Sequence, residues 1–334
     1  MKTGKLPPDI LTRLLSGTRT DPTVIVGPAY GEDAAAVRFG GRVLVAAADP
    51  ITFTTDRIGR YAVSINANDI AVLGATPRYF LATILLPPGS AESEAESVFN
   101  EIEAACRAIG VTLIGGHTEI TSAASRIVVS GCMLGEADES SLIRTSGARV
   151  GNALILAGGY AIEGTAILAR EAADDLRSRG LTDEPILRAS VYLDDPGICI
   201  ANYANIAMRT GGVTAMHDPT EGGIATAIHE MAAAGDCGFV IDREALDDLC
   251  RLPCKAICDA LGLDPLGLLA SGSLLIAVDT DFAAAQLSAF EREGITAARI
   301  GVVTDKQQGT RFADGSPMPS FARDEIARYF DETK

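Results

Sequence analysis

The stretch VSINANDIAVLGATP, residues 63–77, places polar side chains inside an apolar segment. Its apolar residues at helical spacing are Val63, Ile65, Ile70, Val72 and Leu73. Their spacing predicts a buried helix over residues 57–74. Asn66, Asn68 and Asp69 interrupt this surface, and burying an unpaired polar group costs roughly 2–7 kcal/mol. Some other group must therefore hold the Asp69 carboxylate inside the protein.

The composition describes a globular chain with large aliphatic cores. Its 334 residues are 47% hydrophobic and include no tryptophan, and two domains of about 100–200 residues each fit this length. No uninterrupted run of about 18 apolar residues appears, so we expect no membrane span. The first residues lack the apolar region and cleavage site of a secretory signal, which indicates a cytoplasmic location.

The net charge is −16, from 44 acidic and 28 basic residues, and no basic run offsets it. Such a chain repels phosphate backbones, so nucleic acid is not an expected partner. A small anionic ligand stays compatible with this charge if a metal cation or backbone amides receive it.

The order of apolar runs and turns predicts a mixed α/β (α+β) fold in two domains, 1–145 and 146–334. In the first, a hairpin turns at Gly40–Gly41, and a buried strand ends at Gly115–Gly116. In the second, one helix is expected over residues 163–180 and a strand–turn–helix over residues 213–235. The polar stretch around residues 140–150 joins the two domains.

Four aspartates follow apolar strands or lie on the apolar helix: Asp33, Asp49, Asp69 and Asp218. Any one of them is compatible with a turn or a helix N-cap. Together they suggest a convergence of carboxylates, which needs cations among them. Because hard oxygen ligands suit Mg²⁺ or Mn²⁺, and Mg²⁺ commonly arrives with substrate phosphates, the pattern predicts a metal–phosphate site.

Two glycine-containing segments extend this hypothesis. In LIGGHTEIT, Gly115 and Gly116 would let a ligand approach the backbone, and His117, Thr118 and Glu119 offer polar contacts, although a simple glycine turn also explains the pattern. In DPTEGGIATAIHE, the glycines open a helix whose amide end can receive an anion. His217 and His229 are interpreted as structural histidines.

The sequence lacks other common nucleotide-binding signatures. The glycines of AGGYAIEGTA do not follow the dinucleotide pattern, no P-loop occurs, and tight turning explains them. The seven cysteines are interpreted as reduced core residues. The spacing of Cys250, Cys254 and Cys258 leaves a metal site as the alternative, although zinc sites usually use closer pairs.

Several motifs follow one another along nearly the whole chain: GEDAAAV, AADPIT, NANDIAVLGATP, LLPPG, GGHTE, AMHDPTEGGIATAIHEMA and LGLDPLGLLASGSLLIAV. In this order they resemble the aminoimidazole ribonucleotide (AIR) synthase-related, PurM-like superfamily. The HypE-like branch of hydrogenase maturation proteins is the most similar, through YAVSINANDIAVLGATP, EGTAILAREA and LGLDPLGLLASG.

This resemblance implies an ATP-binding homodimer whose N-terminal domains pair their sheets into a β-barrel. It implies that Asp33, Asp49, Asp69 and Asp218 gather Mg²⁺ on the ATP phosphates. The segment Gly115–Glu119 would lie against the nucleotide, and Asn66 and Asn68 would help to orient the cluster. It further implies cofactor contacts from Asn66, Asn68, Gly115, Gly116, His117 and Thr118, and catalytic roles for Asp218, His117 and Glu119. A maturation protein is the expected further partner.

One departure leaves three functions open. HypE acts through a cysteine at its extreme C-terminus, whereas the last cysteine here is Cys258, so the HypE dehydration is not expected to be inherited. The first hypothesis is a HypE-like enzyme that uses Mg-ATP to phosphorylate an oxygen of an acceptor. The second is a kinase of the thiamine monophosphate type. The third is a non-catalytic ATP-binding scaffold.

Overall fold

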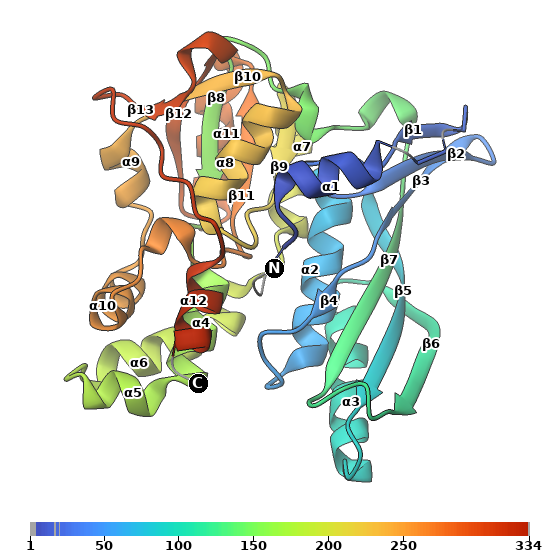
Figure 1. The fold of residues 1–334 in the computed structure, drawn as a ribbon. Coiled ribbons are helices and arrows are strands. Elements are labelled where there is room, and N and C mark those ends of the chain that lie inside the picture. Colours follow the sequence, from blue (N-terminus) through green and yellow to red (C-terminus); the bar gives the residue numbers. More distant parts are fainter. Residues whose placement is uncertain (1–4, 17, 20, 333–334) are drawn as a thin grey trace. The chain divides into compact units, whose positions relative to one another are not determined.

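The computed structural model describes residues 5–16, 18–19 and 21–332 (Figure 1). These residues divide into two compact units. Unit 2 contains Asp33–Leu142 and the described part of the short segment before Pro28. Unit 1 contains Pro28–Glu32, the described residues up to Arg19 and those from Ile143 onward. Each unit has its own mixed sheet, so the mixed α/β fold expected from the sequence is confirmed.

The sheet of unit 2 has the order β1-β2-β3-β7-β5-β6, and β4 also pairs with β7. Neighbouring strands are antiparallel except β5 and β6, which are parallel. As predicted, β2 and β3 form a hairpin that turns at Gly40 and Gly41, both with positive φ. The strands are β1 (Val24–Val26), β2 (Ala35–Phe39), β3 (Arg42–Ala47), β4 (Pro50–Ile51), β5 (Thr76–Leu86), β6 (Thr112–Ile120) and β7 (Val128–Ala137).

Helix α2 (Ile58–Val72) is the predicted buried helix, and only Arg60 among its residues is not buried. It packs on β7, β5 and β3, while α3 (Glu92–Ala108) packs on α2 and β6. Two glycines of β7 permit the close approach of α2. A Cβ at Gly131 would collide with the Asn66 amide, and one at Gly135 would collide with Ile70.

The prediction for β6 is wrong in two respects. The expected buried strand ending at Gly115–Gly116 is instead an exposed strand that continues to Ile120. It lies at the edge of the sheet, and among the described residues β5 is the strand that pairs with it. The register shifts between Phe80 and Leu81, which places an extra residue, Ile114, opposite the pair. The glycines therefore serve this bulge, with φ of 150° and 147°.

The sheet of unit 1 has the order β13-β10-β12-β8-β11-β9, and only the β10–β13 pair is parallel. Every residue of β8 and β11 is buried, so these strands form the centre of the core. The strands are β8 (Ala153–Ala157), β9 (Val213–His217), β10 (Cys237–Ile241), β11 (Leu274–Val278), β12 (Ala297–Asp305) and β13 (Thr310–Phe312). The predicted strand–turn–helix after residue 213 corresponds to β9 and α8.

Helices surround this second sheet, and one differs from its prediction. The helix expected over residues 163–180 is two helices, because Ala172 leaves the helical conformation with φ −115° and ψ 17°. The helices of unit 1 are α1 (Pro8–Leu15), α4 (Ile162–Glu171), α5 (Ala173–Ser178), α6 (Asp183–Ser190), α7 (Ala201–Thr210), α8 (Gly223–Ala234), α9 (Arg243–Asp247), α10 (Leu252–Leu261), α11 (Ala283–Arg292) and α12 (Glu325–Glu332).

The last described segment is held to unit 1 by polar side chains. Glu325 accepts a hydrogen bond from the Asp264 amide at 2.9 Å and pairs with Arg328 at 2.6 Å. Arg328 also donates to the Gly262 carbonyl at 2.7 Å, and the Tyr329 hydroxyl donates to Asp175 at 2.9 Å. Helix α12 therefore docks against the region around α10 and α5. Among the described residues, no helix is both long and apolar enough to cross a membrane.

Candidate functional site

In unit 2, an asparagine of α2 fixes the backbone of a predicted metal ligand. The Asn66 side-chain oxygen accepts a hydrogen bond from the Asp49 amide at 2.9 Å. Its nitrogen donates to the carbonyls of Asp49 at 3.2 Å and Ala62 at 2.8 Å. Both ends of this buried amide therefore bind backbone. Asn66 therefore orients the segment after β3, and this geometry favours its expected role in orienting the aspartates. Its expected contact with the cofactor stays a prediction.

The three aspartates of unit 2 differ in exposure. Asp69 is 4% exposed on α2, one turn from Asn66, and Asn68 is fully buried beside it. Asp33 and Asp49 are partly exposed. A set of carboxylate oxygens of this kind suits a hard divalent cation such as Mg²⁺. The expected gathering of these three with Asp218, which belongs to unit 1, stays a prediction.

The segment Gly115–Glu119 lies within β6, so the strand continues past the glycines at which it was expected to end. His117 Nε2 lies 3.0 Å from Glu119 Oε2, with both side chains about half exposed. The two residues are two apart in the strand, which places them on the same side of the sheet. Packing also requires glycine at position 116, because a Cβ there would collide with the Ala82 carbonyl. The nucleotide contacts expected of this segment stay a prediction.

In unit 1, three segments meet at one edge of the sheet. Strand β11 is antiparallel to both β8 and β9, so the carboxyl ends of β8 and β9 and the amino end of β11 share this edge. The register pairs Leu274 with Ala157 and Leu275 with His217. Asp218, only 1% exposed, follows β9 here. Ligands of α/β proteins commonly bind at such an edge.

A loop ties the starts of α4 and α8 together at this edge. The Gly164 amide donates to the Leu269 carbonyl at 2.9 Å, and the Ala270 amide donates to the Thr220 carbonyl at 3.3 Å. The Ser273 hydroxyl lies 2.5 Å from the Gly159 carbonyl oxygen. The glycines that the sequence interpretation assigned to turns are therefore part of the site's framework.

Two buried carboxylic acids at this edge were missed by the sequence analysis. Glu163, in the first turn of α4, is 3% exposed, and burial raises its pKa to about 8. Asp324, just before α12, is 3% exposed, and burial raises its pKa to about 7 against three opposing amide hydrogen bonds. Those amides belong to Gly222, Leu269 and Ile326. In the sequence, the glycines beside Glu163 were a weak indication of a site there. Nothing near Asp324 indicated its role, because its partner Gly222 lies 102 residues away.

The remaining histidines and the cysteines have structural surroundings. His217 Nε2 lies 3.0 Å from Glu230 Oε2, and His229 Nε2 lies 3.1 Å from the Pro319 carbonyl oxygen. All seven cysteines are free, and five are buried. Burial raises the pKa of the Cys106 thiol to about 12 and that of Cys237 to about 11. Within the part of the chain that the structure describes, no cysteine belongs to a group of three or more side chains that could hold a metal ion. The interpretation of the cysteines as reduced core residues stays a prediction.

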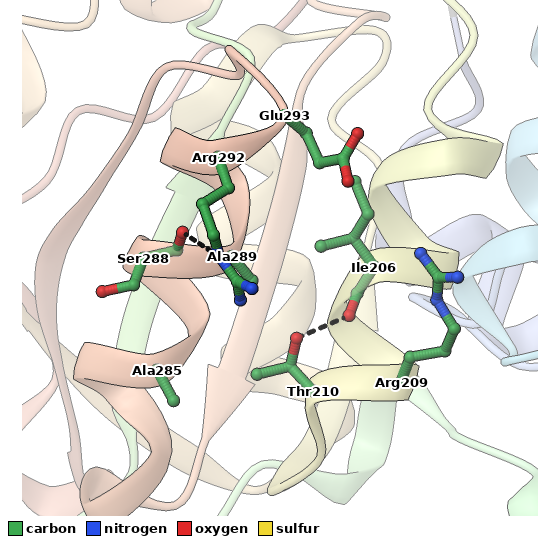
Figure 2. Close-up of a pocket in the computed structure, with 8 residues that line it drawn as sticks. All are labelled: Ile206, Arg209, Thr210, Ala285, Ser288, Ala289, Arg292 and Glu293. Atoms are coloured by element: carbon green, nitrogen blue, oxygen red, sulfur yellow. Dashed lines mark hydrogen bonds between the residues drawn. The ribbon is translucent and has the colours of Figure 1, made fainter.

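A separate groove of about 550 Å³ lies between α7 and α11 (Figure 2). It contains none of the residues predicted from the sequence. The Arg292 side chain is held by a hydrogen bond to the Ser288 carbonyl at 3.2 Å, and Thr210 bonds to the Ile206 carbonyl at 2.8 Å. The lining residues are Ile206, Arg209, Thr210, Ala285, Ser288, Ala289, Arg292 and Glu293.

Comparison with known proteins identifies the family. Residues 31–137 match the AIR synthase related protein, N-terminal domain, and residues 149–314 match the C-terminal domain. The carbamoyl dehydratase HypE of Rhizobium leguminosarum bv. viciae is 30% identical over 302 residues, which is 86% of this chain and 83% of that protein. The chain belongs to the AIR synthase-related proteins.

Solved structures of AIR synthase-related proteins share the fold. The hydrogenase maturation protein HypE in complex with ATP has a TM-score of 0.71 and 24% identity, covering 95% of this chain and 91% of that one. Thiamine monophosphate kinase from Aquifex aeolicus has a TM-score of 0.67 and 19% identity, covering 92% of this chain and 96% of that one. The two-domain PurM-like architecture predicted for this chain is therefore confirmed.

Proposed function

We propose that this protein is a HypE-like enzyme that uses Mg-ATP to phosphorylate an oxygen of an acceptor during metalloenzyme maturation. The observation that supports this most is the 30% identity with a carbamoyl dehydratase HypE across both halves of the chain. The thiamine monophosphate kinase is 19% identical, a likeness that concerns the fold alone. A partner of the HypF kind is part of the proposal, since a chain with the same fold was solved in a HypE–HypF complex.

The proposed nucleotide site uses the predicted carboxylates. Asp69 and Asp218 are almost fully buried, and Asp33 and Asp49 are partly exposed, so the set combines buried anchors with accessible oxygens. These four would hold Mg²⁺ or Mn²⁺, which would neutralise the triphosphate and position it for in-line attack. Asn66 keeps Asp49 in place through its backbone bonds. In this proposal His117 and Glu119 contact the reacting groups from β6, and Gly115, Gly116, Thr118 and Asn68 border the nucleotide.

We also propose that the protein acts as a homodimer built through the sheet of unit 2. Strand β6 presents an exposed edge, and exposed apolar side chains lie on it and beside it: Tyr79, Ile114 and Ile120. Long exposed edges of this kind usually pair with another chain. Pairing of two such sheets would produce the dimeric β-barrel that the family resemblance implies.

Calorimetry with ATP tests the nucleotide site. We expect binding in the presence of Mg²⁺ and its loss when EDTA removes the cation, because the acidic site would otherwise repel the triphosphate. Replacements Asp69→Asn and Asp218→Asn should each raise the Kd of Mg-ATP tenfold or more, about 1.4 kcal/mol. The control is Asp138→Asn, whose side chain is 70% exposed and pairs with Arg42. Unchanged affinity in both site variants would remove these residues from the site.

A further inference from the structure

The groove between α7 and α11 lies wholly within unit 1, and buried contacts hold its two helices together. Gln286 of α11 is fully buried, and its side-chain nitrogen donates to the α7-end carbonyls of Ala207 at 2.9 Å and Gly211 at 2.8 Å. Tyr203 and Phe290 pack edge to face, with ring centroids 6.4 Å apart. The groove is therefore pre-formed, and its volume of about 550 Å³ is in the usual range for small-molecule sites.

The lining of the groove combines an apolar base with charged side chains. Ile206 and Ala289 are 4% and 6% exposed, so they supply the apolar base. Arg209 and Arg292 are both exposed and come from the last turns of the two helices. Figure 2 shows their guanidinium groups on either side of Ile206. A ligand lying over Ile206 would therefore have a cationic group available from each helix.

These two guanidinium groups are not neutralised by carboxylates of the described residues. Arg292 Nε donates to the Ser288 carbonyl at 3.2 Å, which holds the side chain but leaves its two terminal nitrogens for another partner. Arg209 makes no hydrogen bond or ion pair with any residue that the structure describes. Other exposed arginines are paired, as Arg177 is with Asp183 at 2.8 Å. In a chain of net charge −16, two such unpaired arginines in one groove indicate an anionic ligand.

Glu293 limits the charge of that ligand. It lies at one end of the groove, and within the described part of the chain its carboxylate also lacks an ion pair (Figure 2). The charges of Arg209, Arg292 and Glu293 leave the lining with a formal charge of +1. A monoanion balances this charge, whereas a phosphate dianion or a triphosphate would be repelled by Glu293.

We propose that this groove binds a small monocarboxylate that carries an apolar chain. The carboxylate would lie between Arg209 and Arg292, because a guanidinium group matches the planar geometry of a carboxylate. The apolar chain would cover Ile206 and Ala289.

This site is separate from the proposed nucleotide site and does not depend on it. Helix α7 ends at Thr210 and leads into the amino end of β9, whereas Asp218 follows the carboxyl end of that strand. The five residues of β9 therefore separate the end of α7 from the edge that carries Asp218.

The probe for the test is 4-methylpentanoate, which has one carboxylate and a branched aliphatic chain. Saturation-transfer NMR and calorimetry on the full chain should show binding with a Kd in the millimolar range or tighter. The uncharged analogue 4-methylpentanamide and the short anion acetate should each bind about tenfold more weakly or worse, because each lacks one half of the recognition. Inorganic phosphate should bind no better than acetate.

Variants of the lining assign the binding to this groove. Arg209→Gln and Arg292→Gln should each raise the Kd of 4-methylpentanoate about tenfold or more, because each removes charge-assisted hydrogen bonds. Glu293→Gln should leave the affinity equal or higher. The matched control is Arg107→Gln, an exposed arginine in the last turn of α3, which should leave the Kd unchanged. Saturating Mg-ATP should also leave it unchanged.

Four results would overturn the inference. They are no saturation transfer to 4-methylpentanoate, equal affinity for its amide, wild-type affinity in both arginine variants, and displacement of the carboxylate by Mg-ATP. A protein that binds 4-methylpentanoate but not Mg-ATP would refute the proposed function and leave this site in place.

Discussion

The side-chain amide of Asn66 is the connection between α2 and the segment that carries Asp49. Replacing it by aspartate keeps an oxygen for the Asp49 amide but puts a second oxygen against the carbonyls of Asp49 and Ala62. We expect Asn66→Asp to lower the free energy of unfolding by about 2 kcal/mol or more. Urea denaturation measures this, with Asn100→Asp on the exposed face of α3 as the control. An equal loss in both variants would contradict the role given to Asn66.

The buried carboxyl group of Glu163 predicts how stability changes with pH. Its folded-state pKa is raised by burial from 4.5 to about 8, so between these values the folded protein binds more protons than the unfolded chain. Its contribution is therefore fully present below about pH 4.5 and is lost as the pH rises through about 8. The slope is at most about 1.4 kcal/mol per pH unit for each such group.

Glu163→Gln separates this contribution from that of Asp324, whose pKa is raised to about 7. Urea denaturation of the wild-type protein should show stability still falling between pH 7 and 8. In Glu163→Gln the fall should become shallower above pH 7, as Asp324 completes its ionisation. A variant that still loses stability above pH 7 to the wild-type extent would show that Glu163 does not titrate in this range.

The contact between α2 and α3 depends on a glycine in a helix. The Gly59 amide donates to Glu101 Oε2 at 3.1 Å, and a Cβ at Gly59 would lie 2.8 Å from the Val98 carbonyl oxygen and from Ile102 N. An alanine in a helix normally gains about 1 kcal/mol over glycine. Here we expect Gly59→Ala to lower the free energy of unfolding by about 1–3 kcal/mol, because the helices must separate.

Thermal or urea unfolding checks this prediction. Asn100→Ala, at an exposed position of α3, is the control and should leave stability equal or slightly higher. If Gly59→Ala is as stable as the wild type, the close approach of the two helices is not required.

For the protein as a whole, the exposed strand β6 predicts the oligomeric state. Light scattering should show a dimer at micromolar concentration. The double variant Ile114→Glu/Ile120→Glu, at side chains 51% and 64% exposed, should be monomeric because charged groups would then line the pairing edge. Leu252→Glu in α10, where the leucine is 79% exposed, is the matched control and should stay dimeric. A monomeric wild type would exclude the proposed arrangement.

Local patterns were enough to predict most elements. Apolar periodicity identified α2 with its buried polar residues, the β2–β3 hairpin at Gly40–Gly41 and the strand–turn–helix of β9 and α8. These features depend on neighbours within a few residues, which is the range over which periodicity and turn residues act. The family resemblance, carried by ordered motifs, is confirmed by the comparisons. The division at residues 145 and 146 and the roles of the site residues stay predictions.

Position within a sheet and contacts over long sequence separations were decided by the tertiary structure. The sequence of an apolar strand does not show whether the strand lies at the edge of a sheet or between two other strands. For this reason β6 was expected to be buried although it lies at an edge. No proline or glycine at Ala172 predicted the break between α4 and α5. Asp324 reaches the Gly222 amide across 102 residues. The pKa of Glu163 is raised because the fold buries this group and brings the carboxylates of Asp324 and Glu221 near it. The sequence determined which segments form helices and strands, whereas burial, which depends on all of them at once, was settled only by their packing.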